Sequence, residues 1–139
     1  MGKINLGRVI LGGIVAGIVI NISNYVLHNY VTKAANEEAM KRLNLTLPES
    51  GSTIAVWMLW GFAFGIGAIW LYAAIRPRFG PGPGTAIKAG LAAWFFSCLL
   101  ATVSFVNLGI FPFDAVGFLW ELAHSVIATV VGAALYKEP

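Results

Sequence analysis

Hydrophobic and polar positions fall in long blocks along the chain. Apolar residues dominate at about 7–31, 53–75, 85–106 and 115–136. Each block is close to the roughly 20 residues that an α-helix needs to cross a hydrocarbon core about 30 Å thick. Helices are expected because unpaired backbone groups are costly in lipid, and the blocks lack the short alternating strands of a barrel. The pattern predicts an all-α bundle of four transmembrane helices, with residues 1–139 forming a single domain.

The polar connections between these blocks predict two further features. In the first connection, residues 35–43 have the pattern of a short amphipathic helix that lies on the membrane surface, as a lid, a docking element or a solvated connector. Residues 76–84 are rich in proline and glycine and predict a break between helices. Their prolines lack the backbone donors that a phosphate-binding loop needs, so Arg76 and Arg78 are expected to contact lipid headgroups.

Composition agrees with a lipid environment. The chain is 58% hydrophobic and only 11% charged, against about 25% charged residues in soluble domains. A small soluble domain could not cover so much apolar surface. The formal net charge is +3, but the basic residues are scattered at the block ends, which argues against nucleic acid as a partner. The lipid bilayer is therefore the expected partner.

The basic residues also predict sidedness. Four spans place both ends of the chain and the connection at 76–84 on one side. Six basic residues belong to that side: Lys3, Arg8, Arg76, Arg78, Lys88 and Lys137. The other side has Lys33, Lys41 and Arg42, balanced by three glutamates. The positive-inside rule therefore predicts that both termini are cytoplasmic.

Two parts of the sequence resemble each other. Residues 55–63 and 115–123 match at five of nine positions with an offset of 60, and Leu-Tyr recurs at 71–72 and 135–136 with an offset of 64. A weaker match relates residues 13–16 to 90–93. These matches predict two helical hairpins, in units 1–75 and 84–139, related by an axis along the membrane normal. Chance similarity between apolar segments is the alternative.

Small residues spaced four apart predict where helices approach closely, since packing rather than the hydrophobic effect holds helices together in lipid. They pack either within the bundle or against a neighbouring protein. The candidates are Gly13, Gly17, Gly61, Gly65, Ala128 and Gly132.

Polar side chains deep in the first and fourth spans are the candidate functional residues, because ionisable groups in a membrane need partners. They are Asn21, Asn24, His28, Glu121, His124 and Ser125. At 1.5 Å per residue, Asn24 and Glu121 lie roughly 10 Å below the membrane surface, and Asn21 and His124 roughly 15 Å below it. If the two spans touch, these residues form one buried network. That network either fixes helix register or lines a pathway for protons or a solute.

Cofactor binding is a weaker alternative, and no metal is expected. Glu-x-x-His occurs once, at 121–124, whereas di-iron bundles need two such motifs and further carboxylates. Binding of one haem by both His28 and His124 requires similar depths, and theirs differ by roughly 10 Å. Haem or a chlorophyll-type pigment held by one of these histidines remains an alternative.

Residues 70–83, Trp-Leu-Tyr-Ala-Ala-Ile-Arg-Pro-Arg-Phe-Gly-Pro-Gly-Pro, resemble the signature of a family of small bacterial membrane proteins with four spans and no assigned activity. The similarity includes the chain length, the glycine-rich first span and the tryptophans of the second. The resemblance implies the same four-helix fold and a bacterial inner membrane, and it carries over no catalytic residues.

The sequence contains no nucleophile–base–acid arrangement, so a non-enzymatic role is expected. The first hypothesis is an accessory or scaffold subunit of a larger bacterial membrane complex, respiratory or photosynthetic, or a self-associating bundle. The second is a small transporter or proton-conducting protein that uses the Asn/Glu/His cluster. The third is a haem- or chlorophyll-binding subunit.

Overall fold

The computed structural model describes residues 3–46 and 50–138. The described residues form helices joined by short connections, without strands. Four helical segments are long and apolar enough to cross a membrane. The prediction of an all-α chain with four such helices is therefore confirmed.

The helices follow the expected blocks closely. The first span is α1 (Leu6–Val26), continued by a π-helical turn, η1 (Leu27–Val31). The second is α3 (Gly51–Phe79). The third consists of α4 (Pro83–Trp94), the π-helical turn η2 (Phe95–Leu99) and α5 (Leu100–Asn107). The fourth is α6 (Ala115–Ala133), which ends three residues earlier than expected.

Polar residues define three of the helix starts. The side chain of Asn5 accepts a hydrogen bond from Arg8 N at 3.2 Å, and that of Ser50 accepts one from Thr53 N at 3.3 Å. Asp114 likewise accepts from Val116 N at 3.1 Å. These side chains replace backbone partners that the first turn of a helix lacks. The caps therefore fix the residues at which α1, α3 and α6 begin.

The predicted break at residues 76–84 is shorter than expected, which corrects that part of the sequence analysis. Helix α3 continues through Pro77 to Phe79. Proline costs most in a helix interior, and here it stands in the last turn, near the end of the hydrogen-bonded ladder. Gly80 and Gly82 then turn the chain with φ of 81° and 121°, values that disfavour other residues.

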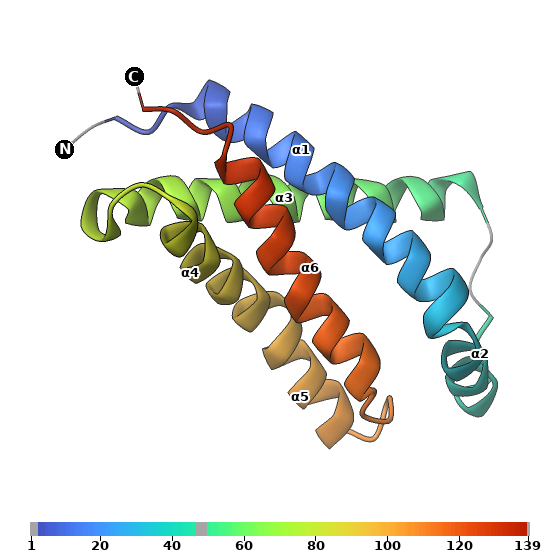
Figure 1. The fold of residues 1–139 in the computed structure, drawn as a ribbon. Helices are drawn as coiled ribbons and strands as arrows, with labels where there is room; N and C mark the ends of the chain where they lie inside the picture. The colour runs from blue at the N-terminus through green and yellow to red at the C-terminus, as the bar shows by residue number, and fades with distance from the viewer. Residues whose placement is uncertain (1–2, 47–49, 139) are drawn as a thin grey trace.

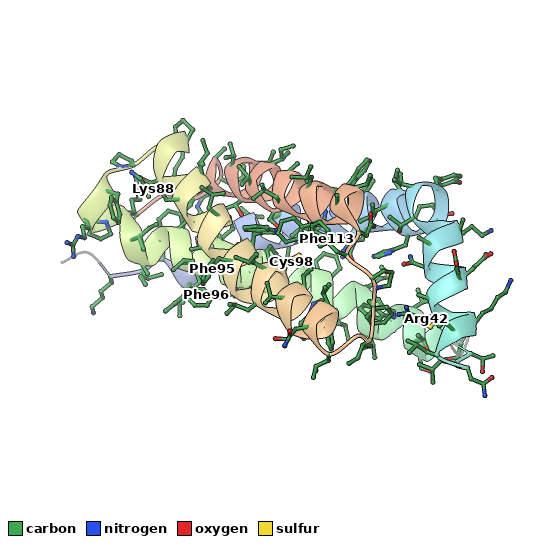
Figure 2. The ribbon with its side chains drawn as sticks, turned by 90° about the horizontal axis from the view of Figure 1, so that it is seen from below. Arg42, Lys88, Phe95, Phe96, Cys98 and Phe113 are labelled. Carbon is green, nitrogen blue, oxygen red and sulfur yellow. The ribbon has the colours of Figure 1, made fainter. Side chains whose placement is uncertain are left out.

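The four spans form a ring in the order α1, α3, α4, α6 (Figure 1). Each helix packs on both neighbours in this ring, and α3 also contacts α6 across it. Both termini lie at the same end of the bundle, while α2 (Lys33–Arg42) lies at the other (Figure 1). We call these the terminal end and the loop end. Lys88 and Arg42 mark the two ends in Figure 2.

Glycine contacts hold the terminal half together. A Cβ atom on Gly13 would lie 2.5 Å from Ile66 Cα, and one on Gly12 would lie 2.5 Å from Gly132 O. One on Gly65 would meet the backbone of Gly13 and Gly17. Carbon atoms normally stay about 3.5–4.0 Å apart, so only glycine allows these approaches. Close backbone contact thus replaces large side chains in this core.

The loop half of the bundle is more open. None of the residues of α5 is buried, whereas α4, in the same span, buries four. At the start of α3, Trp57 and Trp60 are 64% and 67% exposed. The helices therefore separate toward the loop end, and this separation leaves room for a cavity.

Helix α2 lies across this open end. Its Ala39 is buried, and Arg42 donates hydrogen bonds to the carbonyls of Gly109 and Ile110 at 3.5 and 3.1 Å. The arginine thereby ties the first connection to the turn between α5 and α6 (Figure 2). The expected helix at 35–43 is present. Its position on the membrane surface stays a prediction.

Candidate functional site

A chain of hydrogen bonds joins α1 to α6 in the loop half of the bundle. Trp120 Nε1 donates to Ser23 Oγ at 2.8 Å. Ser23 Oγ lies 3.1 Å from His124 Nδ1. His124 Nε2 lies 3.0 Å from Glu121 Oε2. Four polar side chains from two helices therefore form one continuous network around a buried imidazole.

Helical spacing accounts for this arrangement. Trp120, Glu121 and His124 are neighbours on one face of α6, because residues three and four apart are adjacent on a helix. Ser23 lies on the face of α1 that buries Ala16, Ile20 and Leu27, which follows the same spacing. Since α1 and α6 are neighbours in the ring, the two faces meet.

The network accommodates two protonation states without moving a heavy atom. The indole N–H can only donate, so Ser23 Oγ accepts from Trp120. With neutral His124, Ser23 donates to Nδ1 and Nε2–H donates to the Glu121 carboxylate. With a proton added, Nδ1–H donates to the second lone pair of Ser23 Oγ instead. His124 is only 7% exposed, so its ring nitrogens face these partners and not open space.

Glu121 connects this network to a cavity of about 200 Å³ at the loop end. The cavity lies where η1, η2, α5 and the start of α6 separate. Its lining residues are Leu27, His28, Thr32, Asn36, Cys98, Thr102, Phe105, Val106, Phe111, Pro112, Asp114, Gly117, Phe118 and Glu121. Cys98, labelled in Figure 2, reaches it from the third span. Glu121 is part of the cavity wall, and His124 lies behind it at 3.0 Å.

Two π-helical turns border the cavity. In η1, Thr32 N donates to Leu27 O at 2.8 Å, five residues back, and η1 contributes Leu27 and His28 to the wall. In η2, Leu100 N donates to Phe95 O, and η2 contributes Cys98. Such turns are rare and often occur at functional sites, because the extra residue redirects side chains. In this protein, η1 and η2 redirect the first and third spans beside the same cavity.

The structure separates the other predicted polar residues from this network. Asn21 Nδ2 donates to Met58 O of α3 at 3.2 Å, and His28 lines the cavity beside Asn36 Nδ2, 3.4 Å from its Nδ1. Asn24 Oδ1 is buried and has no hydrogen-bond partner among the described residues. Ser125 is buried below His124, and its carbonyl accepts from Thr129 Oγ1 at 2.7 Å.

The predicted packing residues face the inside of the bundle. Gly13, Gly17, Gly61 and Gly65 lie between α1 and α3, where Asn21 covers Gly61. Gly132 lies against Gly12 of α1. Ala128 is fully buried in the same core. These six small residues therefore make their close contacts within one chain.

Arg76 also has partners within the chain. Its guanidinium lies 3.1 Å from Glu138 Oε1 and stacks over Tyr136 at 5.5 Å from the ring centre. Arg78 follows in the last turn of α3. A role of both arginines at lipid headgroups stays a prediction.

The hydrogen bonds of His124 leave neither of its ring nitrogens free for a cofactor. Both ring nitrogens of His124 lie within hydrogen-bond distance of Ser23 or Glu121, so a haem or magnesium ligand would break the network. Over residues 3–46 and 50–138, no group of three His, Cys, Asp or Glu side chains could hold a metal ion. Pigment or haem binding through His28 stays a prediction.

Sequence reasoning missed Ser23 and Trp120 as members of the network. Both carried a signal: Trp120 precedes His124 by one helical turn, and Ser23 shares a face with the buried residues of α1. The cavity residues on the third span, Cys98 and Thr102, carried none. Their position depends on the π-helical turn between α4 and α5, which the sequence does not reveal.

In comparisons with known proteins, no family model, curated protein or solved structure matches this chain. The family resemblance of residues 70–83 therefore stays a prediction.

Proposed function

We propose that this chain is a small transporter or proton-conducting membrane protein that takes up protons at the Glu121–His124 pair. The observation that carries the proposal is the buried imidazole, held between Glu121 at 3.0 Å and Ser23 at 3.1 Å, with Glu121 open to the cavity. Ionisable residues in membrane spans are costly and commonly mark pathways for protons or solutes. This role is not enzymatic.

The test is proton flux into liposomes that contain the purified protein and an entrapped pH-sensitive dye. A potassium gradient with valinomycin supplies the driving force. Glu121→Gln keeps the size and a hydrogen-bond acceptor but cannot exchange a proton. We expect it to slow the flux by about tenfold or more, as loss of a proton-transferring side chain does in enzymes.

Glu38→Gln is the matched control, because Glu38 lies on an exposed face of α2, outside the cavity lining. It should retain the wild-type rate. Circular dichroism and gel filtration of Glu121→Gln show whether the bundle still folds. A wild-type rate equal to that of empty liposomes, or a folded Glu121→Gln variant with unchanged flux, overturns the proposal.

The cavity is proposed to open to the outside of a bacterial inner membrane. The support is the excess of basic residues at the terminal end, which favours a cytoplasmic location of that end under the positive-inside rule. Cys98 is the only cysteine in the sequence and lines the cavity, so it reports the side directly. A membrane-impermeant maleimide should label it in right-side-out vesicles. Labelling only in inverted vesicles would contradict this orientation.

An accessory subunit remains the second candidate function. Its support is the first part of α3, where Ile54, Leu59 and the tryptophans at 57 and 60 are each more than 60% exposed. A partner helix from another subunit would cover this surface. The glycine faces that first suggested docking are occupied inside the bundle, which weakens this candidate. Purification in mild detergent from the native membrane tests it, since an obligate partner would elute with the chain.

We also propose that the bundle is a duplicated hairpin. Asn5 N donates to Tyr136 Oη at 3.3 Å, and Gly82 N donates to Tyr72 Oη at 3.2 Å. Asn5 and Gly82 are the N-cap residues of α1 and α4, and they are 77 positions apart. Tyr72 and Tyr136 are related by the repeat offset of 64. The same kind of bond thus recurs between repeat-related positions.

A glycine contact repeats in the same way. A Cβ on Gly13 would meet Ile66 Cα, and one on Gly90 would meet Val126 Cα. Gly90 follows Gly13 by 77 positions, and Val126 follows Ile66 by 60, the offset that relates the second and fourth spans. The ring order α1, α3, α4, α6 also suits a pseudo-twofold axis along the bundle. These recurrences support duplication over chance similarity.

A further inference from the structure

We infer that the cavity at the loop end binds a small organic ammonium ion, which would be the solute of the site proposed above. This inference rests on that proposed function for its role in transport, but the binding site itself stands on the cavity's charge, walls and size. Each of these three properties points to the same class of ligand.

The charge of the cavity favours a cation. Among the residues that line it, Glu121 and Asp114 are acidic, and none is lysine or arginine. One oxygen of Glu121 lies 3.0 Å from His124. A carboxylate has about four lone-pair positions, so Glu121 keeps acceptor capacity toward the cavity. An anion would face these two carboxylates, and no lysine or arginine of the lining would offset them.

The walls distinguish an organic cation from a metal ion. Phe105, Phe111 and Phe118 line the cavity, and the faces of aromatic rings attract ammonium groups. Neighbouring rings hold these walls in place: Phe105 and Phe111 make an edge-to-face pair at 6.1 Å, and Phe118 packs on Trp94 at 5.0 Å. A hard metal ion needs a shell of oxygen ligands, and among the described residues no three His, Cys, Asp or Glu side chains gather to form the charged part of one.

The size of this open cavity suits a small molecule. About 200 Å³ is below the range of about 300–1,000 Å³ that drug-sized ligands occupy. Thr32, Asn36 and Thr102 on the walls add neutral hydrogen-bonding groups that suit a hydroxyl or amide substituent. A compact quaternary or primary amine with one polar substituent therefore fits the charge, the walls and the space together.

The test is equilibrium binding of radiolabelled choline to the purified protein in detergent. Tetramethylammonium should compete with choline. 3,3-Dimethylbutan-1-ol, which has the shape of choline without its charge, should not. We expect Glu121→Gln to weaken choline binding by about tenfold or more, as loss of a charged partner does. Phe111→Leu should weaken it by about threefold to tenfold through loss of the ring face. Glu38→Gln should bind as wild type does.

Three results overturn the inference: no choline binding by the wild type, equal competition by the neutral analogue, or unchanged affinity in a folded Glu121→Gln variant. These results are separate from those of the flux experiment. Proton flux that depends on Glu121 without choline binding would remove the ammonium site and leave the proposed function. Choline binding without proton flux would leave the ammonium site and remove the proposed function.

Discussion

Replacing Gly65 by alanine should destabilise the bundle, because this position brings α1 and α3 into backbone contact. The added Cβ would lie 2.6 Å from Gly17 N and 3.0 Å from Gly17 Cα, and it would also meet Gly13 O. All three are backbone atoms, so no side chain can rotate away. The helices must separate by about 0.5–1 Å to restore normal contact, which loses a quarter to a half of each affected dispersion contact.

The magnitude follows from two opposing terms. Overpacking of a close interface costs about 1–3 kcal/mol. Alanine in place of glycine within a helix contributes up to about 1 kcal/mol in the other direction. Gly67 isolates the second term, since it lies on the exposed side of the same helix and a Cβ there has no neighbour within 4 Å. The Gly65→Ala and Gly67→Ala variants should therefore differ by about 1–3 kcal/mol in unfolding free energy.

The assay is reversible unfolding in mixed micelles with increasing sodium dodecyl sulfate, followed by tryptophan fluorescence and circular dichroism. Gly67→Ala should unfold at or above the wild-type midpoint, and Gly65→Ala below it. If Gly65→Ala is as stable as Gly67→Ala, the close approach of α1 and α3 does not hold the bundle together. Glycine contacts would then not be what stabilises the terminal half of the bundle.

The same assay checks three smaller effects. Ser23→Ala removes two interhelical hydrogen bonds at about 0.6 kcal/mol each and should cost about 1 kcal/mol; no loss would mean that the polar network adds nothing to stability. Gly80→Ala should cost about 1–2 kcal/mol because its φ is 81°. Gly84→Ala should be neutral or slightly stabilising, because Gly84 lies in the first turn of α4 with open space around it. Equal midpoints of these two variants would refute the strained turn. Tyr72→Phe and Tyr136→Phe should each cost about 1 kcal/mol through the lost backbone bond; clearly unequal losses would argue against duplication.

The spans were predictable because lipid imposes one strong rule on the sequence. Apolar length alone placed the blocks at 53–75 and 85–106 within four residues of the observed helices. The exception was Pro77, interpreted as part of a break. Proline is tolerated in the last turn of a helix, and the glycine with positive φ three residues later ends α3 instead.

The candidate site was predictable only in part. The depth of a residue follows from its position along the span, whereas the partner that it faces depends on how the helices are arranged. Counting residues from the membrane surface placed Asn21 and His124 at similar depth, and the structure places Ser23 beside His124. Asn21 instead faces α3, since it lies one turn after Gly17 on the face that packs there. The angle around the helix, and therefore the partner, depends on which helices are neighbours.

The terminal and loop halves of the bundle differ in how far they follow the proposed repeat. In the terminal half, the tyrosine bonds and glycine contacts recur at related positions, which suits a rigid base made from two similar hairpins. The loop half departs from it: the positions related to Glu121 and His124 by the offset of 60 are Gly61 and Phe64.

The π-helical turns depart from the repeat as well. An offset of 77 relates the first span to the third in the proposed repeat. Adding it to the positions of η1 leads into α5 and not to η2, so the two π-helical turns are not copies of each other. The cavity at the loop end is lined by Glu121, whose partner His124 lies 3.0 Å away, whereas the positions related to these two residues in α3 are glycine and phenylalanine. Ionisable groups within a membrane span are costly, and this pair occurs in only one of the two proposed hairpins, so we interpret it as a functional addition to the proposed scaffold. The proposed function is therefore best tested at Glu121 and His124, where the two proposed hairpins differ.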